Sequence, residues 1–220
     1  MAALAWDSTG TRCYQFGTRK GVLYVYNTGT TSYTTGVAWN GLTGVTESPS
    51  GAETTDLYAD DIKYASMRST EDYSFTIEAY DYPDAFAECD GSAEVANGVH
   101  IGQQKRKMFG FSWVTKIGND VDEEAGYTIH LVWGATASPS DKAYTSINDS
   151  PDAISFSWEC DTNPVPVTGF KPTAHMEIDS TKANPTDLVT LEKKLYGDTA
   201  SEATLPMPDE IIEIMTTSDE

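Results

Sequence analysis

Alternating apolar and polar residues mark several segments of the chain as β-strands. In residues 73–80 an apolar side chain recurs at every second position, which is the period of a strand with one buried face. The apolar set is Tyr73, Phe75, Ile77 and Ala79, and the polar set is Ser74, Thr76 and Glu78. We therefore expect one face of this strand to lie in a core and the other to point away from it.

The same period recurs along most of the chain. Residues 154–160 alternate as clearly, with Ser155, Ser157 and Glu159 on the polar face. Further strands are predicted at 22–26, 37–39, 42–46, 62–67, 109–117, 127–133 and 175–178. Asn40-Gly41 is typical of a tight hairpin turn, so segments 37–39 and 42–46 are predicted to pair with each other.

Two segments have helix signals instead. Pro83 is suited to the first turn of a helix and Gly91 to its end, which predicts a short helix over residues 83–89 with Asp81 available as a cap. A second helix is predicted near 186–196. It would begin after Asn184, end at Gly197 and bury Leu188, Leu191 and Leu195 on one face.

Three segments have no hydrophobic period. Residues 1–20 are predicted to be a flexible N-terminal arm, and residues 47–61 a long loop within a β domain that spans 21–197. A loop of this length in a compact domain is often functional or an interaction arm. Residues 198–220 contain seven acids and no Lys or Arg, which indicates an acidic C-terminal arm whose apolar patch at 211–215 docks on a partner.

Composition supports a mainly β fold of the sandwich or barrel type. The chain has 220 residues, of which 11% are aromatic and 22% charged, and it contains 17 glycines. Aromatic and Thr-rich composition favours strands over helices. This length is sufficient for one large domain with a substantial core.

The net charge of −20 argues against nucleic acid as a tightly bound partner. Affinity for DNA depends mainly on Lys and Arg at phosphates, and the one basic cluster in the sequence is Lys105, Arg106 and Lys107. This cluster is interpreted either as a solvated strand start or as a pairing site for acids on a neighbour. The acidic surface would keep a densely packed protein in solution or repel a passing polyanion.

Cysteine spacing and the N-terminus bear on cellular location. Cys13, Cys89 and Cys160 follow no metal-binding pattern and are predicted to be free thiols in a reducing compartment. No apolar run is long enough to span a membrane, and the first residues lack the features of an export signal. We therefore expect a soluble cytoplasmic product.

Acidic residues offer the first candidate chemistry. A dense group beside aromatic residues raises the possibility of a glycosidase, which needs two carboxyls at a set separation. The group comprises Asp81, Asp84, Glu88, Asp90 and Glu94. With 34 acids in the chain, close pairs arise by chance, so a solvated acidic face is the preferred interpretation. Residues 119–124 resemble a calcium loop only in composition, and a polar hairpin turn is preferred there.

Histidines and known motifs give no further support for an enzyme. His100, His130 and His175 share no metal-ligand spacing, and no nucleophile elbow, phosphate loop or dinucleotide motif is present. We predict no catalytic residue, metal or cofactor. A carbohydrate-binding or adhesin module is the alternative function, because Trp and Tyr faces stack on sugars, but alternation assigns most aromatic residues to the core.

Several strings of the sequence resemble a known family. They are GVAWNGLTGVTESP at 36–49, LYADDIKY at 57–64, TIEAY at 76–80, PDAFAECDG at 83–91, GQQKRK at 102–107, LVWGATASPS at 131–140 and NDSP at 148–151. With these strings the chain resembles the major tail protein, or tail tube protein, of long non-contractile-tailed phages (siphophages) of Gram-positive bacteria. The resemblance extends over roughly residues 20–215, and the N-terminal residues match less well.

The resemblance implies a β-sandwich or barrel-like tail tube fold and a structural, non-enzymatic role in the virion tail. Subunits of such proteins close into hexameric rings that stack into a tube for genome passage. The implied partners are the protein itself, tape measure, tail terminator and distal tail proteins, and DNA in transient non-specific passage, with no membrane and no cofactor. Assembly is expected in the bacterial host cytoplasm.

Residue roles follow as hypotheses from this implied architecture. If an inner sheet lines the channel, the polar strand faces point inward, and an acidic wall would not retain DNA. The candidate channel residues are Ser74, Thr76, Glu78, Ser155, Ser157 and Glu159. The candidate inter-subunit contacts are Glu47, Ser48, Pro49, Glu53, Asp56, Asp60, Asp61, Lys105, Arg106, Lys107, Ile211, Ile212 and Ile214.

Overall fold

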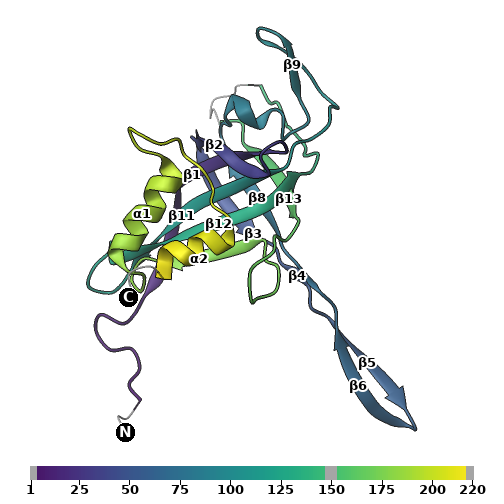
Figure 1. Ribbon diagram of the computed structural model, residues 1–220, viewed down its shortest axis with the longest axis vertical. Coiled ribbons are helices and arrows are strands. Elements are labelled where there is room, and N and C mark those ends of the chain that lie inside the picture. Colours follow the sequence, from purple (N-terminus) through teal and green to yellow (C-terminus); the bar gives the residue numbers. More distant parts are fainter. Residues whose placement is uncertain (1–3, 147–152, 217–220) are drawn as a thin grey trace.

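The computed structural model describes residues 4–146 and 153–216. Within them the chain is mainly β, as predicted, with an eight-stranded antiparallel sheet and two helices near the C-terminus (Figure 1). The sheet contains β1 (Tyr14–Asn27), β2 (Ser32–Trp39), β3 (Leu42–Glu47), β8 (Ser74–Ala79), β11 (Phe109–Gly118), β12 (Gly126–Ala137), β13 (Phe156–Thr162) and β14 (His175–Asp179).

The sheet bends back on itself. Its strand order is β2-β1-β11-β12-β13-β8-β3, with β14 paired to β12. β2 and β3 stand at opposite ends of this order, yet the short turn Asn40-Gly41 joins them. The predicted turn is therefore correct, with Gly41 at φ 76°, but the predicted pairing of its flanking strands is wrong. Instead, β2 pairs with β1 and β3 pairs with β8, so neither strand forms a hydrogen-bonded ladder with the other.

The inside of this bend is filled by a first apolar cluster. β8 contributes Phe75, Ile77 and Ala79, which are almost fully buried, as its alternation predicts. The ring of Trp158, on β13, packs against those of Trp39 and Phe86, with centroid distances of 5.6 Å and 5.1 Å respectively. Four of the five tryptophans are buried, which confirms that most of the large aromatics belong to the core; the exception is Trp6.

A second apolar cluster lies on the outer face of the sheet, under helices α1 (Pro185–Tyr196) and α2 (Pro208–Thr216) (Figure 1). α1 matches its prediction. The Asn184 side chain accepts a hydrogen bond from Thr186 N, Gly197 ends the helix at φ 74°, and the three predicted leucines are buried. Asn184 therefore acts as the N-cap that its sequence position predicts.

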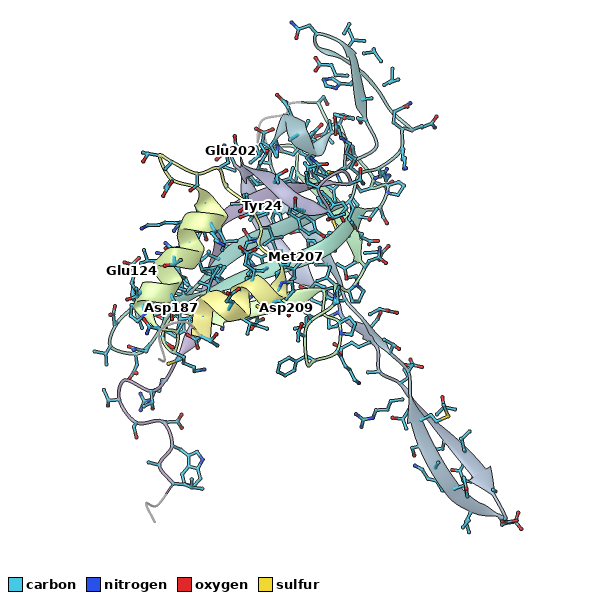
Figure 2. The ribbon with its side chains drawn as sticks, in the orientation of Figure 1. Tyr24, Glu124, Asp187, Glu202, Met207 and Asp209 are labelled. Carbon is cyan, nitrogen blue, oxygen red and sulfur yellow. The ribbon has the colours of Figure 1, made fainter. Side chains whose placement is uncertain are left out.

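The C-terminal segment differs from the expected arm. Residues 208–216 form α2, which packs on the domain's own sheet and buries Ile211 to 1% exposure. Trp133 Nε1 donates to Pro206 O at 3.0 Å, just before the helix. The buried hydroxyl of Tyr24, which is labelled in Figure 2, likewise donates to Leu195 O of α1 at 2.7 Å. Hydrogen bonds from the sheet therefore hold α1 and the segment just before α2.

The N-terminal segment also differs from its prediction. β1 begins at Tyr14, so residues 14–20, expected in a flexible arm, pair with β11 instead. The register shifts between Phe16 and Arg19 and again between Arg19 and Val22. These bulges interrupt the two-residue period, which explains why the sequence pattern did not reveal a strand.

The predicted helix over residues 83–89 is shorter in the structure. It is a single 3-10 turn, η1 (Asp84–Phe86), after Pro83 in an extended conformation. Asp81 Oδ1 accepts from Tyr82 N rather than capping the turn. Phe86 and Cys89 are fully buried, so packing on the first cluster, rather than helix propensity, holds this segment. All three cysteines are free thiols, as predicted.

The predicted long loop 47–61 is instead half of a projecting β-ribbon (Figure 1). The ribbon contains β4 (Ser50–Gly51), β5 (Thr54–Ala59), β6 (Ile62–Arg68) and β7 (Glu71–Asp72). β4 pairs with β7 and β5 with β6, and the turn at its tip has Asp60 and Asp61 at positive φ. We call residues 48–73 the arm. Every residue of β5 is exposed, so no alternation marked it as a strand.

A second, smaller ribbon projects at the other end of the body in Figure 1. It pairs β9 (Ala93–Ala96) with β10 (Val99–Ile101). Val95, Val99 and Ile101 are all more than 40% exposed. Both projections therefore present apolar side chains that the body does not cover.

Candidate assembly surfaces and a histidine cluster

The candidate channel residues come together on one strand face. β8 and β13 are paired neighbours, with Glu78 opposite Ser157 and Thr76 opposite Glu159. Glu78, Ser157 and Glu159 are exposed, Ser74 and Thr76 are half-buried, and Ser155 lies exposed just before β13. Alternate residues of the same strands form the first apolar cluster, so backbone pleating sets the direction of the polar set.

This polar face belongs to the half of the sheet away from the two helices. β3 continues it, since Gly44 lies opposite Glu78 and Thr46 opposite Thr76. The helices pack instead on the second cluster, which draws its sheet residues from β1, β2, β11, β12 and β14. Glu78, Glu159 and Asp161 make the uncovered face acidic, which suits it to solvent or to repelling an anion.

The arm contains most of the acidic residues that were candidates for inter-subunit contact. Glu47, Ser48 and Pro49 lie at its base, and Asp60 and Asp61 form its tip. Asp56 is engaged within the arm, because its Oδ1 lies 2.8 Å from Lys63 Nζ and accepts from the Ser66 hydroxyl at 2.7 Å. Both contacts lower the pKa of Asp56, and the contact with Lys63 has the larger effect.

Exposed apolar residues, which the sequence pattern did not mark as contacts, lie beside these acids in the arm. Tyr58 is 71% exposed, Ile62 63%, Tyr64 75% and Met67 60%. A two-stranded ribbon alone in water is marginally stable at best. Contiguous exposed apolar groups rimmed by polar ones are typical of interaction surfaces. Strand-forming residues on both sides of the Asp60-Asp61 turn are the signal that would have revealed the ribbon.

The basic cluster pairs largely with acids of its own chain. Arg106 donates to Ala137 O at 2.8 Å and lies 3.7 Å from Asp90, and Lys107 forms an ion pair with Glu88. Asp90 is also paired with Lys142, at 2.7 Å. Two acids of the suspected glycosidase group are thus ion-pair partners. Lys105 is exposed.

The three isoleucines of the C-terminal patch face different surroundings. Ile211 is buried in the second cluster, Ile214 is half-buried against it, and Ile212 is 37% exposed. Of the three, Ile212 is therefore the residue most accessible to another molecule.

The suspected calcium loop is a hydrogen-bonded turn. Asn119 Oδ1 accepts from Val121 N and Asp122 N, and Asp122 Oδ1 accepts from Glu124 N. Lys116 pairs with Glu124 at 2.6 Å. These contacts support the preferred interpretation of a polar turn, because the Asn119 and Asp122 side-chain oxygens accept hydrogen bonds from its backbone.

A cluster that the sequence did not predict lies at the base of the arm. It brings together Glu47 at the end of β3, His130 of β12, and His175 and Glu177 of β14. In the described part of the chain, these are the His, Cys, Asp and Glu side chains whose ligand atoms lie close enough together to hold one metal ion. Sequence spacing did not reveal it, since three separate strands supply the four residues; β12 pairs His130 with Glu177 across the ladder.

Burial shapes the electrostatics of this cluster. Burial lowers the pKa of His130, with Glu177 opposing the shift, and lowers the pKa of His175 to about 4, assisted by His130. Burial raises the pKa of Glu47, and the Glu177 charge adds to that rise. The buried atoms His130 Nδ1 and His175 Nε2 have no hydrogen-bond partner among the described residues.

Among known proteins, the chain has a distant structural likeness to part of an injection system. No protein-family model and no curated protein matches the chain. A chain of the extracellular contractile injection system PVC sheath-tube complex in its extended state, solved by cryo-electron microscopy, is similar in structure. The two share 12% identity at a TM-score of 0.33, over 73% of this chain and 88% of that one.

No helix in residues 4–146 and 153–216 combines the length and the apolar character that crossing a membrane requires.

Proposed function

We propose that this protein is a structural subunit of a phage tail tube, which polymerises as stacked hexameric rings around a channel for the genome. The observation that carries the proposal is the arm, an exposed ribbon with apolar side chains on a body that already encloses its own core. The sequence resemblance to siphophage major tail proteins over roughly residues 20–215 supports it independently of the fold.

The shape of the chain suits an assembly built from unlike surfaces. Rings that stack head to tail require heterologous contacts, in which one patch of a subunit meets a different patch of the next. Between Ser48 and Asp60 the arm advances by up to ~3.3 Å per residue, so it reaches at most ~40 Å from its base. That length is sufficient to cross onto an adjacent subunit.

Burial of the arm on a neighbour would be energetically significant. Each large apolar side chain that becomes fully buried contributes about 1.5–3 kcal/mol. Tyr58, Ile62, Tyr64 and Met67 are each at least 60% exposed in the single chain. Their combined burial would offset the entropy lost when the arm is fixed on its partner.

In this proposal the acidic face of β8 and β13 lines the channel. DNA carries a phosphate charge every ~1.7 Å of its axis, so basic walls would retain it. Glu78 and Glu159 lie on the uncovered face and would repel phosphates as DNA passes. The implied partners are further copies of the chain and the tape measure, terminator and distal tail proteins, in the virion tail.

Negative-stain electron microscopy of the purified, untagged protein tests the proposal. We expect rings or long tubes with an axial channel at high protein concentration. A protein that stays monomeric in analytical ultracentrifugation over the same concentration range, with no particles in the micrographs, would contradict it.

A further inference from the structure

We propose that Glu47, His130, His175 and Glu177 bind one divalent transition-metal ion, with Zn²⁺ the best fit, at the base of the arm. This inference does not depend on the tube, because all four residues belong to one chain.

The donor geometry is close to that of a tetrahedral site. The four ligand atoms all lie within 4.8 Å of one another. Glu47 Oε1 is 3.7 Å from both His130 Nδ1 and His175 Nε2, and Glu177 Oε1 is 3.5 Å from His130 Nδ1. Bonds of ~2.0–2.1 Å in a tetrahedron place neighbouring donors about 3.3 Å apart. Small side-chain movements would bring all four atoms to a common ion.

The donor types select the class of metal. Two imidazole nitrogens and two carboxylate oxygens form a set that Zn²⁺ accepts readily, whereas Ca²⁺ and Mg²⁺ prefer oxygen ligands alone. The His130 side chain is 7% exposed and that of His175 16%, while those of Glu47 and Glu177 are 34% and 52% exposed. The carboxylates therefore form the side of the site from which an ion enters.

Ring stacking holds both imidazoles in place. The His130 ring lies 4.8 Å from the Trp113 ring at an interplanar angle of 3°, and the His175 ring lies 4.8 Å from the Tyr73 ring at 7°. His130 Nε2 is 3.0 Å from Thr115 Oγ1, so it can donate its proton there and leave Nδ1 with a free lone pair. A hydrogen bond of this kind commonly orients a metal-binding histidine.

The two unpartnered nitrogens are the independent observation that points to a ligand. His130 is 5% exposed, and its Nδ1, directed at the two carboxylates, has no hydrogen-bond partner among the described residues. His175 Nε2, which lies 3.7 Å from Glu47 Oε1, likewise has no hydrogen-bond partner among these residues. A buried polar atom without a partner is costly, and one cation would satisfy both nitrogens and both carboxylates.

The site would connect three strands at the point where the arm leaves the body. Glu47 is the last residue of β3, and Ser48, next in the chain, donates its backbone N–H to Ser74 O at 2.8 Å. A bound ion would tie this junction to β12 and β14. We therefore expect metal binding to slow hydrogen exchange at Ser48 and at the strand ends around the site, without changing exchange at the tip of the arm.

Titration of the full-length, untagged protein tests the site. The protein carries Cys13→Ser in every sample, because this exposed thiol could bind Zn²⁺ by itself. After treatment with a chelator and dialysis, calorimetric titration with ZnCl₂ should give one ion per chain. Titration with Co²⁺ should give the visible absorption of a four-coordinate nitrogen and oxygen site. Absence of stoichiometric binding in both titrations would overturn the proposal.

Variants locate the bound ion. Glu177→Gln and His175→Gln should each weaken Zn²⁺ binding at least about tenfold, whereas the matched changes Glu94→Gln and His100→Gln, both exposed and outside the site, should leave it unchanged. Glu177 is half-exposed, so its substitution tests the site even if the His175 variant fails to fold. Equal affinities for Glu177→Gln and Glu94→Gln would refute the assignment.

Discussion

The body and the arm are both antiparallel β-structure, yet they differ in what covers their strands. In β8 of the body, alternate residues are buried to 1% exposure or less. In β5 of the arm, every residue is exposed, and the ribbon pairs only with itself among the described residues. Burial of apolar surface drives folding. The body buries enough of it to be stable alone, whereas a two-stranded ribbon such as the arm does not.

This difference separates the consequences of substitutions. In the body, a change should appear as lost stability of the monomer. In the arm, a change of similar chemical size should leave the monomer folded and appear in assembly. Unfolding and assembly, measured on the same variants, therefore test whether the two regions differ in this way.

The largest effect on folding is expected for Trp158→Ala. Trp158 is fully buried between Trp39 and Phe86, and truncation of such a side chain costs about 3–5 kcal/mol. Urea unfolding followed by far-UV circular dichroism measures the loss. A change below about 1 kcal/mol would show that the first apolar cluster is not the main source of stability.

A smaller loss is expected for Tyr24→Phe. The Tyr24 hydroxyl donates to Leu195 O at 2.7 Å and lies 3.2 Å from Ser112 Oγ, and both contacts are buried. Its removal leaves acceptors without a partner, at a cost of about 1–3 kcal/mol. Tyr64→Phe removes the same group from an exposed arm position and serves as the control, with no measurable change in the urea midpoint.

Little effect on folding is expected for the double variant Tyr58→Ser, Tyr64→Ser. Both side chains are more than 70% exposed, so the free energy of unfolding should change by no more than about 0.5 kcal/mol. Tube formation should be lost or shifted to higher protein concentration. If pelleting assays show normal tubes, these aromatic residues are not contacts.

The smallest effect on folding and assembly is expected for Glu78→Gln with Glu159→Gln. Both residues are exposed on the face proposed to line the channel, so neither stability nor tube yield should change measurably. The channel would lose two acidic groups per subunit. A tube reconstruction by cryo-electron microscopy that places both side chains on the outer wall would refute their assignment to the channel.

Alternation of apolar and polar residues predicted the strands that bury one of their two faces. Residues 73–80 and 154–160 each have one face in a core, and Asn184 and Gly197 mark the ends of α1. The predicted apolar face of residues 127–133 lies in the second cluster, but the other face of this strand is buried as well. Half of the arm was predicted, since β6 (Ile62–Arg68) matches the strand expected at 62–67. β5 could not be recognised by the same rule, because all of its residues are exposed. Nor could the ladder partners of β2 and β3, since a local turn does not specify which distant strand pairs with each.

For the candidate sites too, local sequence patterns predicted what depends on one strand but not what depends on the pairing of distant strands. Strand alternation placed Glu78 and Glu159 together on one polar face, because it needs only the period of each strand. The histidine cluster depends on the register between β12 and β14 and on the position of the end of β3. Such long-range geometry is not contained in residue spacing. Bulges likewise concealed the first residues of β1.

Removal of the arm tests whether the arm joins the subunits of the tube. Replacement of residues 50–72 with a short Gly-Ser linker preserves the junction, where Ser48 N donates to Ser74 O at 2.8 Å. We expect wild-type protein to form tubes in negative stain and the armless variant to remain a monomer with the urea midpoint of the wild-type body. Normal tubes from the armless variant would contradict it.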